Sequence, residues 1–285
     1  RKAGEWVPNK YGGRENLEAL EFLREFNTVA HGNHPGVLTI AEESTAFPGV
    51  SRPVHLGGVG FSFKWNMGWM NDSLVYFSKD PVYRRHDHHQ ITFSIMYAWS
   101  ENYILPISHD EVVHGKRSLL DKMPGDEWQK RANYRLFMSY MAAHPGKKLM
   151  FMGSEFGQWH EWREHEQLDW PVLQDPKHQG LRDLNRELAR FYRDHPQFHA
   201  SDCEASGFRW SDLHNADESV FAFLRQENGH EPIACVFNAT PVPREDYWLG
   251  VPDPGHYDVV FDSDFPGFGG GGFAGVNGYD AFAHV

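Results

Sequence analysis

The stretch that decides the fold class is Asn102-Tyr103-Ile104-Leu105-Pro106-Ile107-Ser108-His109-Asp110-Glu111. A short apolar run changes at once into polar and acidic residues, which is typical of a buried strand that ends in a loop. The pattern occurs twice more: residues 37–41 lead into Glu42-Glu43, and residues 147–153 lead into Ser154-Glu155. We therefore expect three buried strands, each ending in carboxylates.

Helical patterns lie between these strands. Apolar residues recur at helical spacing over residues 14–29, 126–143 and 181–195, and the second of these places Trp128 and Tyr140 on one face. We expect the first helix to pack on the sheet. Helices that alternate with wholly apolar strands indicate βα units and a parallel sheet covered on both faces. The chain order predicts an α/β barrel.

The pattern changes after about residue 208. Short alternating runs at residues 220–224, 233–237 and 257–261 are separated by turn clusters such as Asn228-Gly229, which is typical of an antiparallel β domain. We place a domain boundary near residue 200, with the barrel segment at 1–200 and an all-β domain at 201–285.

Charge and composition exclude several classes of protein. The formal net charge of -12 argues against a nucleic-acid partner, since such binding requires a basic surface. Two cysteines, Cys203 and Cys235, are too few for a disulfide framework. No apolar run is long enough to span a membrane. We expect a cytoplasmic protein.

The strand ends carry the candidate chemistry. In an α/β barrel the functional groups collect at the carboxyl ends of the strands, where Glu42 or Glu43, Asp110 or Glu111, and Glu155 can converge. Glycosyl transfer needs an acid, a nucleophile or base, and a carboxylate that stabilises the transition state. The competing interpretations are surface or capping carboxylates, and a divalent metal site that includes His109.

Aromatic residues near these strand ends suggest a sugar-binding groove, because aromatic rings stack on the apolar faces of glucose units. Trp159 and Trp162 follow Glu155 in a polar loop, so we expect them at a groove, and we predict that Glu155 and Trp159 contact the substrate. The segment His160–His165 does not have the histidine spacing of a zinc-protease motif. We predict no metal and no organic cofactor.

Longer motifs around these residues are more specific. They are Ala41-Glu42-Glu43-Ser44-Thr45 with Phe47-Pro48-Gly49-Val50-Ser51-Arg52-Pro53, residues 63–70, residues 105–116, Met123-Pro124-Gly125-Asp126, residues 151–156 and residues 238–243. Together they resemble the bacterial glycogen branching enzymes of the α-amylase superfamily. This resemblance implies a retaining transglycosidase that cleaves α-1,4-glucan and reattaches the chain through an α-1,6 linkage. It also implies that residues 1–200 form the second half of a (β/α)₈ barrel.

The resemblance assigns roles that spacing could not. It implies that Glu42 is the general acid/base, that Asp110 stabilises the transition state, and that His109 hydrogen-bonds the sugar. The nucleophilic aspartate of the family, in a Gly-x-Arg-x-Asp-Ala type motif, is absent from these residues. We therefore expect the chain to be part of a longer polypeptide, whose N-terminal half is its partner in forming the site.

Two alternative functions remain open at this stage. One is another hydrolase or glucanotransferase of the same superfamily, because transfer and hydrolysis use the same active-site residues. The other is a non-catalytic glucan-binding protein.

Overall fold

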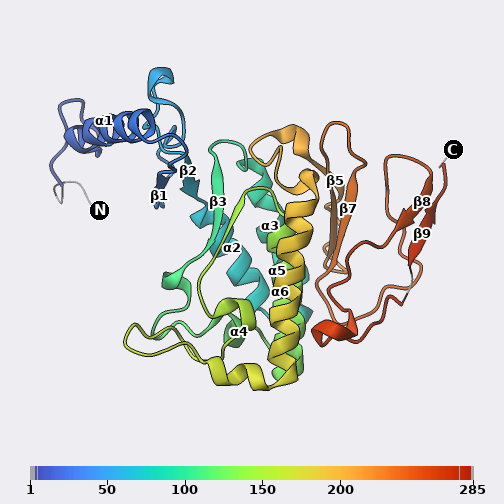
Figure 1. Cartoon of the computed structure of the whole chain (residues 1–285). Coiled ribbons are helices and arrows are strands. Elements are labelled where there is room, and N and C mark those ends of the chain that lie inside the picture. Colours follow the sequence, from blue (N-terminus) through green and yellow to red (C-terminus); the bar gives the residue numbers. More distant parts are fainter. Residues whose placement is uncertain (1–3, 5, 276, 284–285) are drawn as a thin grey trace.

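Four short strands form a parallel sheet in chain order (Figure 1). The computed structural model describes residues 4, 6–275 and 277–283. The strands are β1 (Ile40–Ala41), β2 (Phe63–Trp65), β3 (Tyr103–Ile107) and β4 (Lys147–Met150). Each strand pairs in parallel with the next, for example Ile40 with Phe63 and Ile104 with Lys147. All four carboxyl ends therefore lie along one edge of the sheet.

Helices precede, connect and follow these strands. They are α1 (Leu17–Asn33), α2 (Met67–Ser78), α3 (His88–Thr92), α4 (Leu119–Lys122), α5 (Glu127–Ala143) and α6 (Pro176–Asp194). Their starting points follow from local chemistry. Asp126 caps α5 in a reciprocal arrangement with Gln129, and Asp175 caps α6, whose first residue is a proline.

Short 3₁₀ helices occupy many of the loops. They are η1 (Val54–Leu56), η2 (Pro81–Asp87), η3 (Phe93–Met96), η4 (His109–Glu111), η5 (Ser154–Phe156), η6 (Trp170–Gln174), η7 (Pro196–Phe198), η8 (Ala205–Gly207) and η9 (Pro266–Phe268). Two of these turns, η4 and η5, directly follow β3 and β4 and so lie at the carboxyl edge of the parallel sheet.

The rest of the chain is antiparallel. Strands β5 (Phe208–Asp212), β6 (Val220–Arg225) and β7 (Ile233–Asn238) form one sheet, and β8 (Gly255–Asp258) pairs with β9 (Gly278–Ala281). The predicted boundary near residue 200 falls in the linker between α6 and β5, and it stays a prediction. Figure 1 shows the β5–β7 sheet on the opposite side of α5 and α6 from β3.

One hydrophobic core joins these layers. Trp69 of α2 stacks with Phe137 and Tyr140 of α5, and Phe77 of α2 meets Phe137 edge to face. Tyr140 packs edge-on against Phe221 of β6. All five side chains are fully buried. Burial of each large aromatic side chain stabilises the fold by roughly 2–3 kcal/mol. The helices are thus held between the two sheets, which fixes the parallel strands relative to the rest of the chain.

The N-terminal part differs from our expectation. The helix predicted over residues 14–29 forms, but its apolar side chains Phe22, Phe26 and Val29 are exposed instead of packing on the sheet. Its recorded long-range contacts are polar: Arg24 Nε and Asn27 Nδ2 donate to backbone carbonyls in the segment before β2. The stretch 14–29 is amphipathic, but the described residues place no sheet beneath its apolar face.

Three strands are also shorter than predicted. The strand expected over 147–153 spans only Lys147–Met150; its first three residues are half-buried and Met150 is exposed, because within the described residues β4 is an edge strand that pairs only with β3. The strand expected over 37–41 is reduced to Ile40–Ala41, and Val37, Leu38 and Ile40 are exposed. β1 lies at the edge of the sheet and pairs only with β2, so the prediction of a wholly buried strand is wrong within the described residues. The strand expected over 257–261 instead spans Gly255–Asp258.

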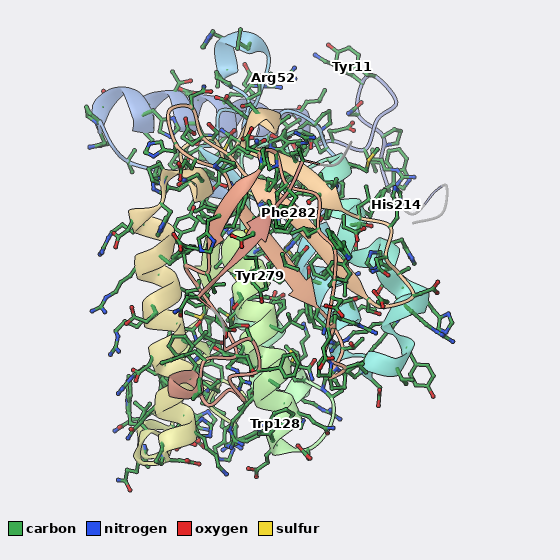
Figure 2. The ribbon with its side chains drawn as sticks, turned by 90° about the vertical axis from the view of Figure 1, so that its right-hand side faces the viewer. Tyr11, Arg52, Trp128, His214, Tyr279 and Phe282 are labelled. Carbon is green, nitrogen blue, oxygen red and sulfur yellow. The ribbon has the colours of Figure 1, made fainter. Side chains whose placement is uncertain are left out.

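The face predicted for α5 is only partly buried. Tyr140 lies in the core, but Trp128 is exposed at the N-terminal end of the helix, where Figure 2 labels it below the β8–β9 hairpin. The first turn of α5 extends beyond the core, so the helical periodicity there does not correspond to burial. Among the described residues, no helix has the length and apolarity needed to cross a membrane.

Candidate active site at the carboxyl ends of the parallel strands

The parallel sheet brings the predicted site residues to one edge. Glu42 follows β1 directly, His109 and Asp110 lie in η4 just after β3, and Glu155 lies in η5 after β4. In Figure 1 the loops after β3 and β4 lie together at the lower left, beside α4. This edge is where parallel α/β folds carry their functional groups.

The two acids after β1 have different surroundings. Glu43 Oε1 accepts a hydrogen bond from Thr45 N at 2.7 Å. The hydrogen bonds from Thr45 and the charge of Lys64 lower the pKa of the Glu43 carboxyl, against the effect of its partial burial. The side chain of Glu42 is exposed, and it makes no hydrogen bond or ion pair with any other described residue. Glu42 is thus the member of the pair that can face a ligand.

A buried lysine holds the loop that follows Glu42. The side chain of Lys64, on β2, is 3% exposed, and its Nζ donates to the carbonyl oxygen of Thr45 at 2.8 Å. Burial lowers the pKa of Lys64, while the nearby carboxylates of Glu101 and Glu43 partly offset this effect. The path of the chain after Glu42 is therefore fixed from the interior of the sheet.

A buried glutamate holds the same loop further along the chain. Glu101 accepts hydrogen bonds from the backbone N–H groups of Val50 and Ser51 at 2.9 and 2.7 Å, and from Ser51 Oγ at 2.5 Å. Ser51 Oγ in turn accepts from Asn102 N, at the start of β3. The loop from β1 to β2 is thus attached to both neighbouring strands, although it contains little regular structure.

The acids after β3 divide in the same way. Glu111 is buried, and its Oε2 accepts from Ser108 N at 2.6 Å and from Ser108 Oγ at 2.7 Å, which closes a capping box. Asp110 is 49% exposed, and Oδ1 of Asp110 lies 3.5 Å from Nε2 of His109, itself 46% exposed. Glu111 therefore shapes the turn that presents His109 and Asp110 at the surface.

Aromatic side chains lie beside His109. Its ring centroid is 6.0 Å from that of Phe151 and 6.0 Å from that of Trp162, and these two rings meet edge to face at 5.1 Å. Trp162 was expected at a groove from its position in a polar loop. Phe151 was not, because the sequence places it within an apolar run and no local signal marks it as a neighbour of His109.

Glu155 and Trp159 lie farther along the same edge. The Glu155 carbonyl oxygen accepts from Asn185 Nδ2 at 2.9 Å, which ties η5 to α6, and its side chain is partly exposed. The Trp159 ring lies 5.4 Å from the Arg131 guanidinium and 5.8 Å from the His178 ring, so its recorded aromatic and cation–π contacts are with α5 and α6. The substrate role of both residues stays a prediction.

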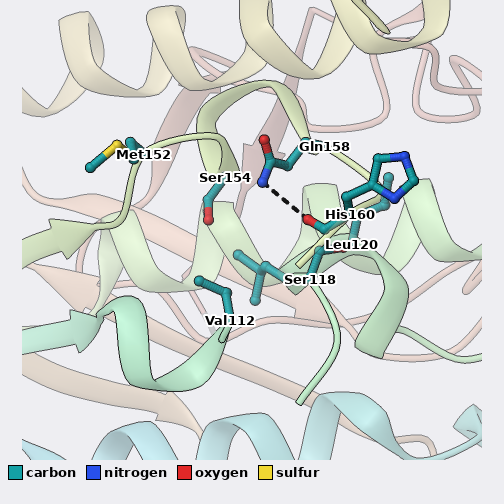
Figure 3. Close-up of a pocket in the computed structure, with 9 residues that line it drawn as sticks. Val112, Ser118, Leu120, Met152, Ser154, Gln158 and His160 are labelled. Carbon is teal, nitrogen blue, oxygen red and sulfur yellow. Dashed lines mark hydrogen bonds between the residues drawn. The ribbon is translucent and has the colours of Figure 1, made fainter. Parts of the chain in front are cut away.

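A small pocket lies between these loops (Figure 3). It is lined by Val112, Ser118, Leu119, Leu120, Met152, Ser154, Gly157, Gln158 and His160. Gln158 Nε2 donates to the carbonyl oxygen of His160 at 3.0 Å across one side of it. None of the predicted site residues, Glu42, His109, Asp110, Glu155 and Trp159, lines this pocket.

The described residues do not support the interpretation of a divalent metal site. No group of three or more His, Cys, Asp or Glu side chains in this part of the chain has an arrangement that could hold a metal ion. The His109–Asp110 pair is not accompanied by a third ligand there.

The chain is similar to known proteins over most of its length. It is 59% identical over 271 residues to the 1,4-alpha-glucan branching enzyme GlgB of Thiobacillus denitrificans, and this match covers 95% of the chain and 37% of the relative. The corresponding enzyme of Aquifex aeolicus is 55% identical over 278 residues, covering 97% of the chain and 44% of the relative. The chain thus spans well under half the length of these curated relatives.

Two further comparisons concern the fold. The family described as alpha amylase, C-terminal all-beta domain matches residues 210–283. A debranching enzyme from Nostoc punctiforme is 16% identical, with a TM-score of 0.54 over 76% of this chain and 45% of that protein. A cyclomaltodextrinase is 20% identical, with a TM-score of 0.52 over 83% of this chain and 38% of that protein. The fold class predicted from the sequence, half an α/β barrel followed by an antiparallel β domain, is confirmed.

The motifs after β1 and β3 resemble those of the bacterial glycogen branching enzymes. Matches at 55–59% identity over nearly the whole chain, together with the α-amylase C-terminal domain, confirm this resemblance. The resemblance of this chain to the glycogen branching enzymes of the α-amylase superfamily is therefore established over the length of the chain.

Proposed function

We propose that this chain supplies the acid/base side of a 1,4-α-glucan branching site. Glu42 is the general acid/base, Asp110 stabilises the oxocarbenium-like transition state, and His109 hydrogen-bonds the sugar at the cleaved position. Glu155 and Trp159 contact the glucan farther along the groove. The reaction is retaining, so the second carboxylate is a nucleophile that forms a covalent glucosyl intermediate.

One observation carries this proposal most directly. At each of two strand ends, one acid of an adjacent pair is bonded to the backbone, Glu43 to Thr45 and Glu111 to Ser108. The other acid, Glu42 or Asp110, is left at the surface of the same sheet edge. Structural carboxylates hold the turns, and two carboxylates remain for chemistry.

The proposed sequence of steps uses these residues in turn. Glu42 protonates the oxygen that leaves the α-1,4 linkage while the nucleophile attacks the anomeric carbon. Asp110 stabilises the positive charge that develops on the sugar ring. Glu42, now a carboxylate, then takes the proton from a glucan 6-hydroxyl, which attacks the intermediate and forms the α-1,6 branch.

The nucleophile is part of the proposal. We propose that an aspartate from a preceding region of the same polypeptide supplies it, which agrees with the branching-enzyme relatives being more than twice as long as this chain. The other partner is the glucan, and a cytoplasmic location follows from the proposed role in glycogen synthesis. None of the steps needs a metal ion or an organic cofactor.

Product analysis on amylose tests the proposal with the full-length protein. We expect new α-1,6 linkages to form with little increase in reducing ends, because the acceptor is a sugar hydroxyl. Reducing ends that rise in step with cleavage would indicate a hydrolase of the same superfamily. Binding of amylose without any change in linkages would indicate a non-catalytic glucan-binding protein.

A further inference from the structure

Two loops at the carboxyl edge are fastened to each other. One follows η4 and spans residues 112–117, and the other follows η5 and spans residues 158–169. Trp162 N donates to the carbonyl oxygen of Val112 at 2.8 Å, and Val113 and Trp162 form an isolated parallel bridge. The loop after β4 thus pairs with the loop after β3 beyond the ends of both strands.

A carboxylate makes a second connection between these loops. Glu161 Oε2 accepts from Gly115 N at 3.0 Å, and Glu161 Oε1 accepts from Arg117 N at 2.5 Å. Gly115 and Arg117 both have positive φ angles, 80° and 65°. Backbone of this kind turns neighbouring N–H groups toward one point and forms a concave site for an anion. Here that anion is the side chain of Glu161.

The surroundings of Glu161 favour its charged form. The hydrogen bonds from Arg117 and Gly115 lower the pKa of its carboxyl, and its side chain is only 24% exposed. His114 Nδ1 lies 3.6 Å from Oε2. The Lys122 ammonium group donates to the carbonyl oxygen of Lys116 in the same loop, and its charge also lowers the pKa of Glu161. Two charged side chains, Glu161 and Lys122, therefore hold the backbone of the 112–117 loop.

Trp162, the residue next to Glu161, contacts His109. The Trp162 ring meets His109 at 6.0 Å with an interplanar angle of 82°, and Phe151 at 5.1 Å with an angle of 79°. The backbone of Trp162 is fixed by its hydrogen bond to Val112. The neighbouring residue, Glu161, is fixed through its carboxylate, which accepts from Gly115 N and Arg117 N. The position of this ring against His109 thus depends on the connection between the two loops.

We propose that Glu161 is a positioning residue of the branching site: its contacts with Gly115 and Arg117 hold the Trp162 ring against His109 as one wall of the glucan groove. The inference rests on the proposed function. Glu161 does not touch the reacting atoms and acts through Trp162. Loosening the wall weakens glucan binding and admits water, so the share of cleaved bonds that end in hydrolysis rises.

The test compares three variants of the full-length protein. Glu161→Ala removes both acceptors, and Glu161→Gln keeps one acceptor oxygen but sets an amide N–H₂ against a backbone donor. The control, Glu164→Ala, removes an exposed carboxylate from the same loop whose recorded ion pair is with its neighbour His165. We expect Glu161→Ala to raise KM for amylose by about tenfold or more, as for loss of hydrogen bonds to a charged group.

Further readouts separate positioning from general destabilisation. In Glu161→Ala, kcat should change much less than KM, and reducing ends should rise relative to new branches. Glu161→Gln should show a smaller change in both quantities, and Glu164→Ala should match the wild type. If Glu161→Ala fails to fold, Glu161→Gln carries the same comparison. Equal kinetics for the Glu161 and Glu164 variants would overturn the proposal. So would losses of kcat and of the thermal midpoint that are the same in Glu161→Ala and in Glu161→Gln.

A double-mutant cycle tests whether Glu161 acts through Trp162. In a Trp162→Ala background, Glu161→Ala should add little to the increase in KM, because residues that act through one another are not additive. If the double variant raised KM by the product of the two single-variant factors, the result would contradict the proposal. A wild-type protein that forms no α-1,6 linkages would overturn the proposed function instead, and the Glu161 comparison would then be read from amylose affinity alone.

Discussion

Glu42 and Glu43 are adjacent in the chain but differ in what they contact. Glu43 is bonded to Thr45, whereas the Glu42 side chain has no bonded partner among the described residues. The sequence indicated that an acid at this strand end is functional, but spacing could not choose between the two. The resemblance implies Glu42, and its role as the acid/base stays a proposal, with which the hydrogen bond of Glu43 to Thr45 agrees.

A pair of matched substitutions distinguishes their roles. Glu42→Gln in the full-length protein should lower kcat by about 10²–10⁴-fold, which is the usual contribution of a general acid/base. Glucan binding should be retained, because the amide has the same shape as the carboxyl group. Glu43→Gln should lower kcat much less and should reduce the thermal midpoint, since it weakens the bond to Thr45.

Steady-state kinetics and glucan binding, measured on both variants, check this expectation. Near wild-type turnover in Glu42→Gln would mean that the acid/base is misassigned. A larger loss of kcat in Glu43→Gln than in Glu42→Gln would reverse the two roles.

Trp159 and Trp162 illustrate what the sequence could not provide at this scale. Both lie in the same polar loop and carry the same local signal. Only the tertiary contacts separate them, since Trp162 meets His109 whereas Trp159 meets Arg131 and His178. A side chain's neighbours depend on how the loop is fastened, and the residues that fasten it, such as Val112 and Gly115, are distant in sequence.

At the scale of elements, helix α5 shows how well a capped, strongly periodic segment can be predicted. The sequence predicted residues 126–143, and the helix spans Glu127–Ala143 with Asp126 as its cap. Strand β1 was much less predictable. Its apolar residues matched a buried strand, but only two of them pair with β2, because burial depends on which elements lie alongside and the local sequence does not encode them.

The C-terminal end of α5 carries a buried histidine that should make the fold sensitive to acid. His144 Nδ1 bonds the Pro145 carbonyl oxygen at 2.8 Å, so this nitrogen carries a hydrogen, and Nε2 lies 2.9 Å from Ser94 Oγ. Both contacts are satisfied by the neutral ring. Burial lowers the pKa of His144 from 6.5 to about 3, despite the opposing hydrogen bond to Pro145.

This shift predicts a defined pH window. Below pH 6.5 the unfolded chain binds a proton at His144 that the folded chain does not bind, so stability falls as the pH falls toward about 3. The full effect is about 5 kcal/mol. His144→Gln, which cannot titrate, should lose less stability than the wild type between pH 7 and pH 4. Acid titration of the thermal midpoint checks this, with the exposed His86→Gln as control; parallel curves for wild type and His144→Gln would contradict it.

At the scale of the whole molecule, a buried ionic network connects the parallel and antiparallel parts. Arg225 of β6 is fully buried and donates to Asp202 Oδ1 at 2.7 Å, to the Ala143 carbonyl oxygen at 2.7 Å and to the Gly207 carbonyl oxygen at 3.1 Å. Lys147 of β4 pairs with the same aspartate at 3.4 Å. The positive charges around Asp202 lower its pKa, outweighing the opposite effect of burial.

The network predicts a large penalty for removing one member. Arg225→Met leaves Asp202 with fewer partners and removes the donor to the Ala143 carbonyl oxygen, while the Gly207 carbonyl oxygen keeps the bond from Gln226 N. The substitution should destabilise the protein by about 3–5 kcal/mol. The control is Arg209→Met, which changes an exposed arginine on the neighbouring strand β5. Thermal unfolding of the full-length variants measures the difference, and the double variant Arg225→Met with Asp202→Asn should recover part of the loss. Equal midpoints for the two arginine variants would show that the network contributes little.

The chain order of the parallel sheet has a consequence for biosynthesis. Every strand from β2 to β4 pairs with the strand made just before it. During synthesis each of these three strands therefore leaves the ribosome when one of its hydrogen-bonding neighbours already exists. The sheet can grow one βα unit at a time in the direction of translation, and each newly made strand extends it.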